Sequence, residues 1–210
     1  MKIILHDIGK KYNSHWLYQN INFVIEQNDS VAITGPNGSG KSTLIKMLSG
    51  YLIPTKGDIQ WVSNEKPILP DLLYQHYSFC APYTDLPEEF TLTEVLQWYF
   101  AFKPLLKLTN TKELIEIGKF ERDLNKPISQ FSSGMKQRLK LLLALYTDSP
   151  LMLLDEPTAN LDETNTEWYL QTIRHVINLK TIIIASNNAH EYSFCTKKIQ
   201  LADYIDHKAN

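Results

Sequence analysis

The stretch Gly35-Pro36-Asn37-Gly38-Ser39-Gly40-Lys41-Ser42 has the spacing of a phosphate-binding loop. It follows a short β-prone run at residues 31–34 and precedes Thr43, where an apolar helical pattern begins. The glycines let the backbone wrap around an anion, so that its N–H groups and a helix N-terminus point at the ligand. We therefore expect Lys41 to reach the β- and γ-phosphates of a nucleotide and Ser42 to ligate Mg²⁺. A plain glycine turn between strand and helix is the structural alternative.

The composition is that of a globular protein. With 210 residues, 43% hydrophobic and 21% charged, the chain suits one large domain, or one domain that carries an insertion. The net charge of -2 argues against non-specific binding of nucleic acid. No apolar run approaches the roughly 20 residues that span a bilayer, and residues 1–7 do not resemble a signal peptide. Cys80 and Cys195 lack metal-like spacing, so we expect buried free thiols in a cytoplasmic protein.

The predicted strands are of two kinds. Residues 2–9 and 21–26 alternate apolar and polar side chains, which is typical of antiparallel strands with one wet face. Residues 151–154 and 181–185 are continuous apolar runs, which indicates parallel strands buried on both faces. Residues 76–80 are a further candidate for a core strand.

A helical region lies between these groups of strands. Thr91 and Glu94 have the spacing of a capping box, and helical periodicity continues to about residue 145. The predicted fold is therefore an α/β core with a mostly parallel sheet, an N-terminal antiparallel β subdomain and a small helical insertion near residues 84–135, in a single domain of residues 1–210.

Two carboxylates follow the apolar run at residues 151–154. Asp155 ends the predicted strand beside the phosphate-binding loop, where an acidic residue can hold the Mg²⁺ shell. Glu156 comes next and can orient or deprotonate an attacking water molecule. An acidic turn at the end of a strand is the structural alternative, which the intact loop at residues 35–42 makes improbable.

A second anion-ready helix terminus is predicted at Ser132-Ser133-Gly134-Met135. It offers serine hydroxyls and free amides in front of the apolar run at residues 139–145. Taken alone, it is more often an ordinary N-capped helix. Its place shortly before Asp155 and Glu156 favours a functional role.

In this order the motifs resemble those of the ATP-binding cassette family, the P-loop ATPase subunits of ABC transporters, over essentially the whole chain. Residues 35–42 match Walker A, residues 151–155 match Walker B, and Glu156 matches the catalytic glutamate. Residues 132–135 resemble the signature sequence, and Asn160-Leu161-Asp162 the D-loop. Tyr12 is similar to the aromatic residue that stacks on adenine, with Trp16 as the alternative.

The resemblance implies a head-to-tail dimer of identical or different cassettes around two ATP molecules and Mg²⁺. The residues that it places on the nucleotide are Tyr12, Gly35, Pro36, Asn37, Gly38, Ser39, Gly40, Lys41, Ser42 and Thr43 of one subunit and Ser132, Ser133 and Gly134 of the other. It assigns the metal to Ser42 and Asp155, and catalysis to Lys41, Glu156 and Asn187. The helical insertion then contacts an integral membrane permease, which holds the protein on the inner face of the cell membrane.

Three positions depart from the family pattern. Residues 79–84 lack the glutamine that serves as a Mg²⁺ ligand in the family. A water molecule or the Tyr83 hydroxyl therefore has to supply the missing oxygen ligand. Asn187 stands where a histidine is expected; it can donate a hydrogen bond but cannot carry charge, and His190 is a weaker candidate for that role. Met135 replaces the glutamine that closes the signature.

These departures predict a slow but genuine ATPase, because one lost transition-state donor costs about 10²- to 10³-fold in rate. The alternative function is an ATP-gated regulatory or assembly ATPase that acts on a soluble partner. The terminal Asp206-His207-Lys208 is expected to be solvated surface.

Overall fold

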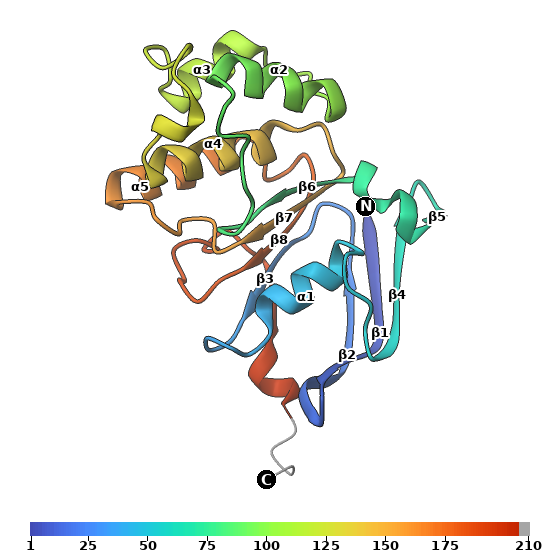
Figure 1. Ribbon diagram of the computed structural model, residues 1–210. Helices are drawn as coiled ribbons and strands as arrows, with labels where there is room; N and C mark the ends of the chain where they lie inside the picture. Colours follow the sequence, from blue (N-terminus) through green and yellow to red (C-terminus); the bar gives the residue numbers. More distant parts are fainter. Residues whose placement is uncertain (206–210) are drawn as a thin grey trace.

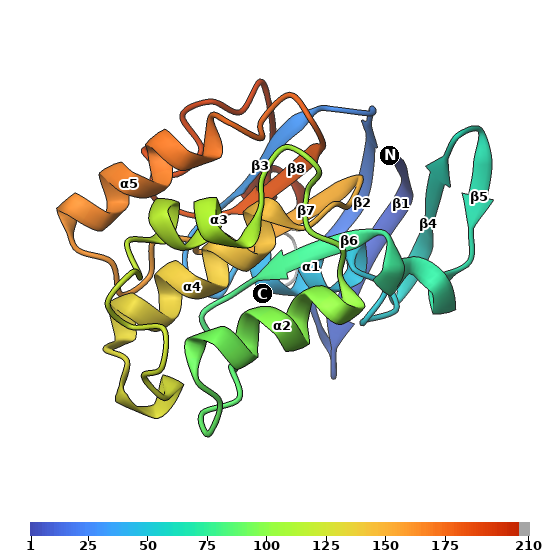
Figure 2. The same ribbon diagram turned by 90° about the horizontal axis from the view of Figure 1, so that it is seen from above.

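A parallel sheet of five strands forms the centre of the computed structural model, which describes residues 1–205 (Figures 1 and 2). Its strand order is β6-β7-β8-β3-β9. The bounds are β3 Ser30–Thr34, β6 Tyr77–Cys80, β7 Leu151–Asp155, β8 Thr181–Ala185 and β9 Lys197–Gln200. All four neighbouring pairs are parallel, so the predicted parallel core is confirmed.

Alternate residues of β7 enter different hydrophobic clusters. Met152 and Leu154 belong to the cluster under the helices, whereas Leu151 and Leu153 belong to the cluster shared with the N-terminal strands. All four side chains are fully buried. The continuous apolar run is therefore explained by a strand that is covered on both faces.

The antiparallel sheet has the order β2-β1-β4-β5. Its strands are β1 Lys2–Tyr12, β2 His15–Ile25, β4 Lys56–Ser63 and β5 Lys66–Ile68. Strands β1 and β2 pair with Ile3 opposite Ile25, and both run several residues further than the alternation predicted. Helix α1, Lys41–Leu48, shares a hydrophobic cluster with both sheets and so fixes the parallel core against the antiparallel one.

Four helices lie on the opposite side of the parallel sheet, with α4 next to the sheet and α2 and α3 beyond α4 (Figure 1). They are α2 Leu92–Phe102, α3 Thr111–Gly118, α4 Ser133–Tyr146 and α5 Glu163–Ile173, with short 3₁₀ turns η1 Pro70–Gln75, η2 Ile128–Gln130 and η3 Leu201–Tyr204. The predicted capping box of Thr91 and Glu94 is present at the start of α2. The predicted fold class is thus confirmed, while the division into one domain with an insertion at residues 84–135 stays a prediction.

Several smaller expectations have mixed outcomes. Cys80 is buried, and burial raises the pKa of its thiol to about 12. Cys195 is only partly buried, because it lies in the loop before β9 rather than in a core strand, so the expectation of burial was wrong there. Within residues 1–205, no helix has the length and apolar character needed to cross a bilayer. Residues 206–210, including the predicted solvated tail, lie outside the described part of the chain.

Candidate nucleotide-binding site

The loop between β3 and α1 has a backbone that requires glycine. Gly38 and Gly40 have φ angles of 82° and 94°, in the left-handed region that other residues rarely adopt. A Cβ at Gly40 would lie 2.7 Å from Cε1 of Tyr18, whose side chain is fully buried. Gly40 is also the N-cap residue of α1 and gives that helix no side-chain cap. The first amides of α1 are therefore left for an anion or for solvent.

Lys41, the first residue of α1, folds back over this loop. Its Nζ donates hydrogen bonds to the carbonyl oxygens of Gly35 at 2.9 Å and Pro36 at 3.2 Å. The residue is only 5% exposed, so the ammonium group is fixed in direction. These bonds place a positive charge above the loop that the sequence identified as an anion cradle.

Asp155 ends β7 with a carboxylate that is only half satisfied. Its Oδ2 accepts a hydrogen bond from the Tyr83 hydroxyl at 3.0 Å, whereas its buried Oδ1 has no hydrogen-bond partner within residues 1–205. Burial raises the pKa of the Asp155 carboxyl, and the neighbouring hydroxyls of Ser42 and Tyr83 act in the opposite direction. An unpaired carboxylate oxygen near a serine hydroxyl is a donor set that suits Mg²⁺, so Ser42 and Asp155 fit this ion.

One cavity of about 430 Å³ collects residues from three segments of the chain. This volume is within the usual range for a small-molecule site. It brings together predicted residues from β1, the glycine loop and the end of β7; the lining is Tyr12, Leu17, Asn37, Gly38, Gly40, Lys41, Ser42, Thr43 and Glu156. Trp16, the alternative to Tyr12, is not part of this lining.

Glu156 enters the cavity because of a sharp turn after β7. Its φ angle is 44°, and its backbone N–H donates to the Ala185 carbonyl oxygen at the end of β8 at 2.8 Å. The side chain is exposed, unlike that of the buried Asp155 beside it. Two adjacent carboxylates thus have different environments, one suited to a metal and one to water.

Asn187 lies against the glycine loop, as its predicted role requires. Its Nδ2 donates a hydrogen bond to Oδ1 of Asn37 at 2.6 Å. His190 is exposed and does not line the cavity, which gives it no place in the site of this structure.

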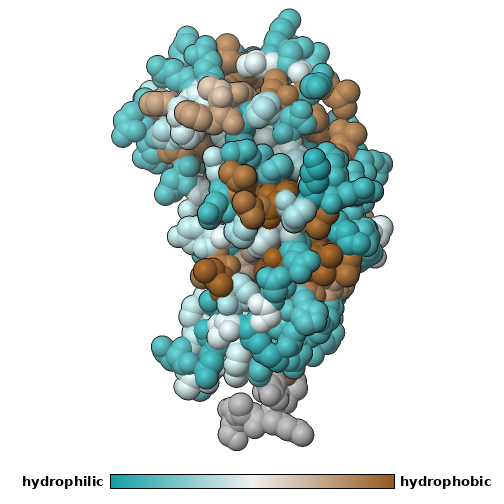
Figure 3. Space-filling view, turned by 90° about the vertical axis from the view of Figure 1, so that its right-hand side faces the viewer, coloured by the Kyte–Doolittle hydropathy of each residue, from teal (hydrophilic) through white to brown (hydrophobic). Residues whose placement is uncertain are grey.

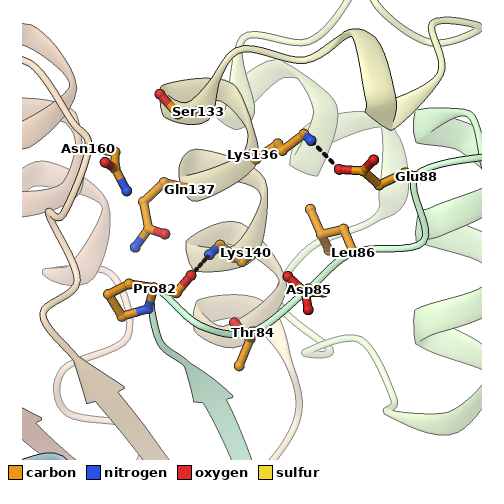
Figure 4. A pocket seen from close by; sticks show the side chains of 10 residues that line it. All are labelled: Pro82, Thr84, Asp85, Leu86, Glu88, Ser133, Lys136, Gln137, Lys140 and Asn160. Carbon is orange, nitrogen blue, oxygen red and sulfur yellow. Dashed lines mark hydrogen bonds and ion pairs between the residues drawn. The ribbon is translucent and has the colours of Figure 1, made fainter.

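The serine-glycine turn is not brought to the glycine loop within one chain. Ser132 caps α4 by accepting a hydrogen bond from the Met135 N–H at 3.2 Å. Ser133 lines a different cavity, of about 320 Å³, beside the segment that follows β6 (Figure 4). None of Ser132, Ser133 and Gly134 lines the cavity that contains Lys41.

Sequence reasoning missed two charged residues next to the site. Glu191 is 4% exposed; its Oε1 accepts hydrogen bonds from the Thr158 N–H and hydroxyl, and burial raises the pKa of its carboxyl. Lys140 donates to the carbonyl oxygens of Ala81 at 3.1 Å and Pro82 at 3.2 Å. A lone cation within the apolar run of α4 was a usable signal for Lys140, whereas nothing local marks Glu191.

Comparison with known proteins gives consistent relatives. The family model described as ABC transporter matches residues 18–159. The Nod factor export ATP-binding protein I of Rhizobium johnstonii is 30% identical over 193 residues, which are 90% of this chain and 62% of that protein. An uncharacterized ABC transporter ATP-binding protein of Bacillus subtilis, YxlF, is 29% identical over 190 residues, covering 89% of this chain and 63% of its own. The chain thus spans about three fifths of these bacterial relatives, and it spans 11% of human ATP-binding cassette sub-family A member 6.

Solved structures share the same fold. A putative ABC transporter ATP-binding protein from Pyrococcus furiosus superposes with a TM-score of 0.81 at 26% identity, over 98% of this chain and all of that one. A dimeric ATP-binding cassette in a post-hydrolysis state, bound to ADP and Pi, superposes with a TM-score of 0.78 at 22% identity, over 94% of this chain and 93% of that one. With its motifs in the expected order and its family model covering more than half of the residues, the chain belongs to the ABC transporter family, as an ATP-binding cassette.

Proposed function

We propose that this chain is the ATP-binding and ATP-hydrolysing subunit of an ABC transporter, and that it acts with a second cassette and a membrane permease. The observation that carries the proposal is the meeting of Lys41, Ser42 and Glu156 in one cavity, with the free Oδ1 of Asp155 as a further oxygen donor near Ser42. This combination supplies a cation, a metal-binding pair and a base, which are the groups that phosphoryl transfer needs.

Each residue has a role that its contacts support. Lys41 exchanges the Gly35 and Pro36 carbonyl oxygens for phosphate oxygens, because a phosphate is the stronger acceptor for an ammonium group. Glu156 holds the proton of the attacking water molecule. Mg²⁺, held by Ser42 and Asp155, supplies neutralisation of phosphate charge when bound. Tyr12 is half exposed and offers its ring to the adenine base.

A second copy or a related cassette is needed to complete this site. The cavity around Lys41 has the exposed Glu156 in its lining, and the serine-glycine turn of the same chain lines none of it. Ser132 and Gly134 of a partner cassette are proposed to close it, which agrees with the dimeric arrangement of the ADP-bound structural relative.

The side of the molecule that carries η1 and the end of α2 suits a permease. Lys103 donates to the carbonyl oxygens of Tyr74 and Tyr77, so the end of α2 lies against η1 and β6. Figure 3 views this side and shows hydrophobic side chains gathered in its middle. Large exposed apolar or aromatic side chains in these segments are those of Leu69, Leu72, Tyr74 and Phe102. Patches of this kind mark sites of protein association, and this one supports attachment to the membrane through a partner.

The experiment that tests the proposal is trapping of the ATP-bound dimer. Glu156→Gln keeps the shape of the side chain but removes the base, so we expect it to form a dimer in gel filtration with saturating ATP and Mg²⁺ and to hydrolyse ATP far more slowly than wild type. Glu121→Gln, at an exposed glutamate outside the cavity, is the matched control and is expected to behave as wild type. A Glu156→Gln protein that stays monomeric would contradict the proposed sandwich.

A further inference from the structure

The segment that leaves β6 is anchored on two sides. Thr84 closes a turn by donating from its N–H and its hydroxyl to the Ala81 carbonyl oxygen, at 3.2 Å and 2.7 Å. The Lys140 ammonium group, on α4, donates to the carbonyl oxygen of Ala81 and to that of Pro82; Figure 4 shows the bond to Pro82. Because both ends of this short turn are held, the direction of the Tyr83 side chain within it is fixed.

Tyr83 connects the protein surface to a buried carboxylate. Its ring lies under the Lys46 ammonium group, 4.4 Å from the centroid, and beside the Phe79 ring at 6.2 Å. The residue is 46% exposed and lines a cavity of about 290 Å³ together with Lys46, Tyr51 and Phe79. The hydroxyl at the other end of the ring donates to Oδ2 of Asp155, which is 1% exposed.

This hydrogen bond helps to set the orientation of the Asp155 carboxylate, which also has the Ser42 hydroxyl as a neighbour. Oδ2 is occupied by Tyr83, and Oδ1 is buried without a partner within residues 1–205. Rotation of the carboxylate would break the bond to Tyr83, and a buried charged acceptor that loses its donor is costly. The tyrosine therefore helps to hold the carboxylate in this orientation.

We propose that Tyr83 is a positioning residue, which holds Oδ2 of Asp155 so that Oδ1 faces the metal ion of a bound nucleotide. The inference rests on the proposed function of this site. Tyr83 acts through Asp155, because its hydroxyl donates its proton to the carboxylate. The anchored turn and the cation over the ring hold the donor in place before the metal arrives.

The test separates metal binding from nucleotide binding. ATP affinity is measured by calorimetry for wild type and Tyr83→Phe, once with excess EDTA and once with saturating Mg²⁺. We expect affinities in EDTA to agree within about twofold, because the phosphate cradle is intact, and the gain in affinity from Mg²⁺ to fall about tenfold, as for loss of one hydrogen bond to a charged group. Tyr51→Phe, in the same cavity, is the control and is expected to retain the full gain.

Two results would overturn the inference. One is a Tyr83→Phe protein with the same gain from Mg²⁺ as wild type, and the other is an equal loss of affinity in EDTA and in Mg²⁺, which would indicate a structural role only. If Tyr83→Phe does not fold, Lys140→Met carries the test, since it frees the turn but keeps the hydroxyl; an undiminished gain from Mg²⁺ would then overturn the inference. A wild-type protein with no Mg²⁺-dependent binding of ATP would instead contradict the proposed function.

Discussion

The two helices that we propose to bind phosphate, α1 and α4, begin in different ways. Helix α1 follows Gly40, which offers no side-chain cap, whereas α4 follows Ser132, whose oxygen accepts from the Met135 N–H. Helices α2, α3 and α5 also have side-chain caps. Among the α-helices of residues 1–205, the start of α1 is thus the exception, with its amides left for a ligand.

The comparison also explains how one motif can have two roles. A serine that accepts a cap hydrogen bond through its oxygen keeps its hydroxyl proton for a second partner. Ser132 can therefore stabilise α4 in the free protein and donate to the phosphate of a partner cassette. In the proposed function, helix α1 would bind phosphate through a bare terminus, and α4 would contribute one extra donor to the site of a partner chain.

Among the changes that test the contrast between α1 and α4, the largest expected effect comes from a methyl group added to the start of α4. Within residues 1–205, and apart from α4 itself, the atom nearest to a Cβ at Gly134 would be the Asn160 carbonyl oxygen, at 3.4 Å. Gly134→Ala should therefore fold normally, while its methyl group crowds the partner's nucleotide. We expect the affinity of the ATP-bound dimer to fall about ten- to a hundredfold, measured by analytical ultracentrifugation in the Glu156→Gln background.

Gly118→Ala is the control, because it is expected to change stability and not the dimer. A Cβ there would lie 2.5 Å from Cδ2 of Phe120, inside the helical layer. Gly118→Ala should lower the melting temperature and leave the dimer affinity of the folded protein unchanged. The contrast between α1 and α4 would fail if Gly134→Ala lowered stability and spared the dimer.

A smaller effect, on ATP turnover, is expected at Asn187, where the site lacks a charged hydrogen-bond donor. The Asn187 amide donates to Asn37 on the loop before α1, and it carries no charge. A histidine in this place can supply a charge-assisted hydrogen bond to phosphate, which is stronger than a neutral one. We expect Asn187→His to raise steady-state ATP turnover about tenfold. An unchanged or lower rate would show that Asn187 is not the position that limits turnover.

The last expected effect is on stability and lies at the other end of α4, far from any ligand role. The Lys180 ammonium group donates to the carbonyl oxygens of Leu145 at 3.0 Å and Thr147 at 2.6 Å, and burial lowers its pKa from 10.5 to about 8. Between these two values the unfolded chain binds a proton that the folded chain does not. Lys180 therefore makes the free energy of unfolding rise as the pH increases from about 8 to 10.5. Below about pH 8 it adds no pH dependence.

Lys180→Met removes this contribution. We expect the difference in urea-unfolding free energy between wild type and Lys180→Met to shift in favour of wild type as the pH rises through that window. Lys198→Met, at an exposed position, should show no such trend. A constant difference for Lys180→Met would mean that the lysine stays charged in the folded protein.

Local patterns were sufficient for most of the fold. The glycine loop, the capping box of Thr91 and Glu94 and the buried strand before Asp155 each depend on residues close in sequence, and each was confirmed. Helix α2 ends at Phe102, two residues before Pro104, because a proline disfavours helical backbone in the residue that precedes it. Strands β7 and β8 were recognisable as parallel strands because a strand that is buried on both faces has no position for a polar side chain.

The contacts around the site were beyond local reasoning. The Tyr83 hydroxyl and the Asp155 carboxylate are 72 positions apart, and Lys140 is 58 from Pro82. Such pairs depend on which strands are neighbours and on where a turn directs its side chain. The sequence showed that a glutamine was missing after β6; only the structure showed which side chain reaches the carboxylate instead.

The most direct test of the central claim is the binding of ATP with Mg²⁺ to wild type and to Lys41→Ala, measured by calorimetry on folded protein. The account predicts clear binding by wild type and a loss of at least about a hundredfold in affinity for the variant, because a bare helix terminus without its ammonium group holds a triphosphate poorly. Equal affinities, or no uptake of nucleotide by intact wild-type protein, would contradict it.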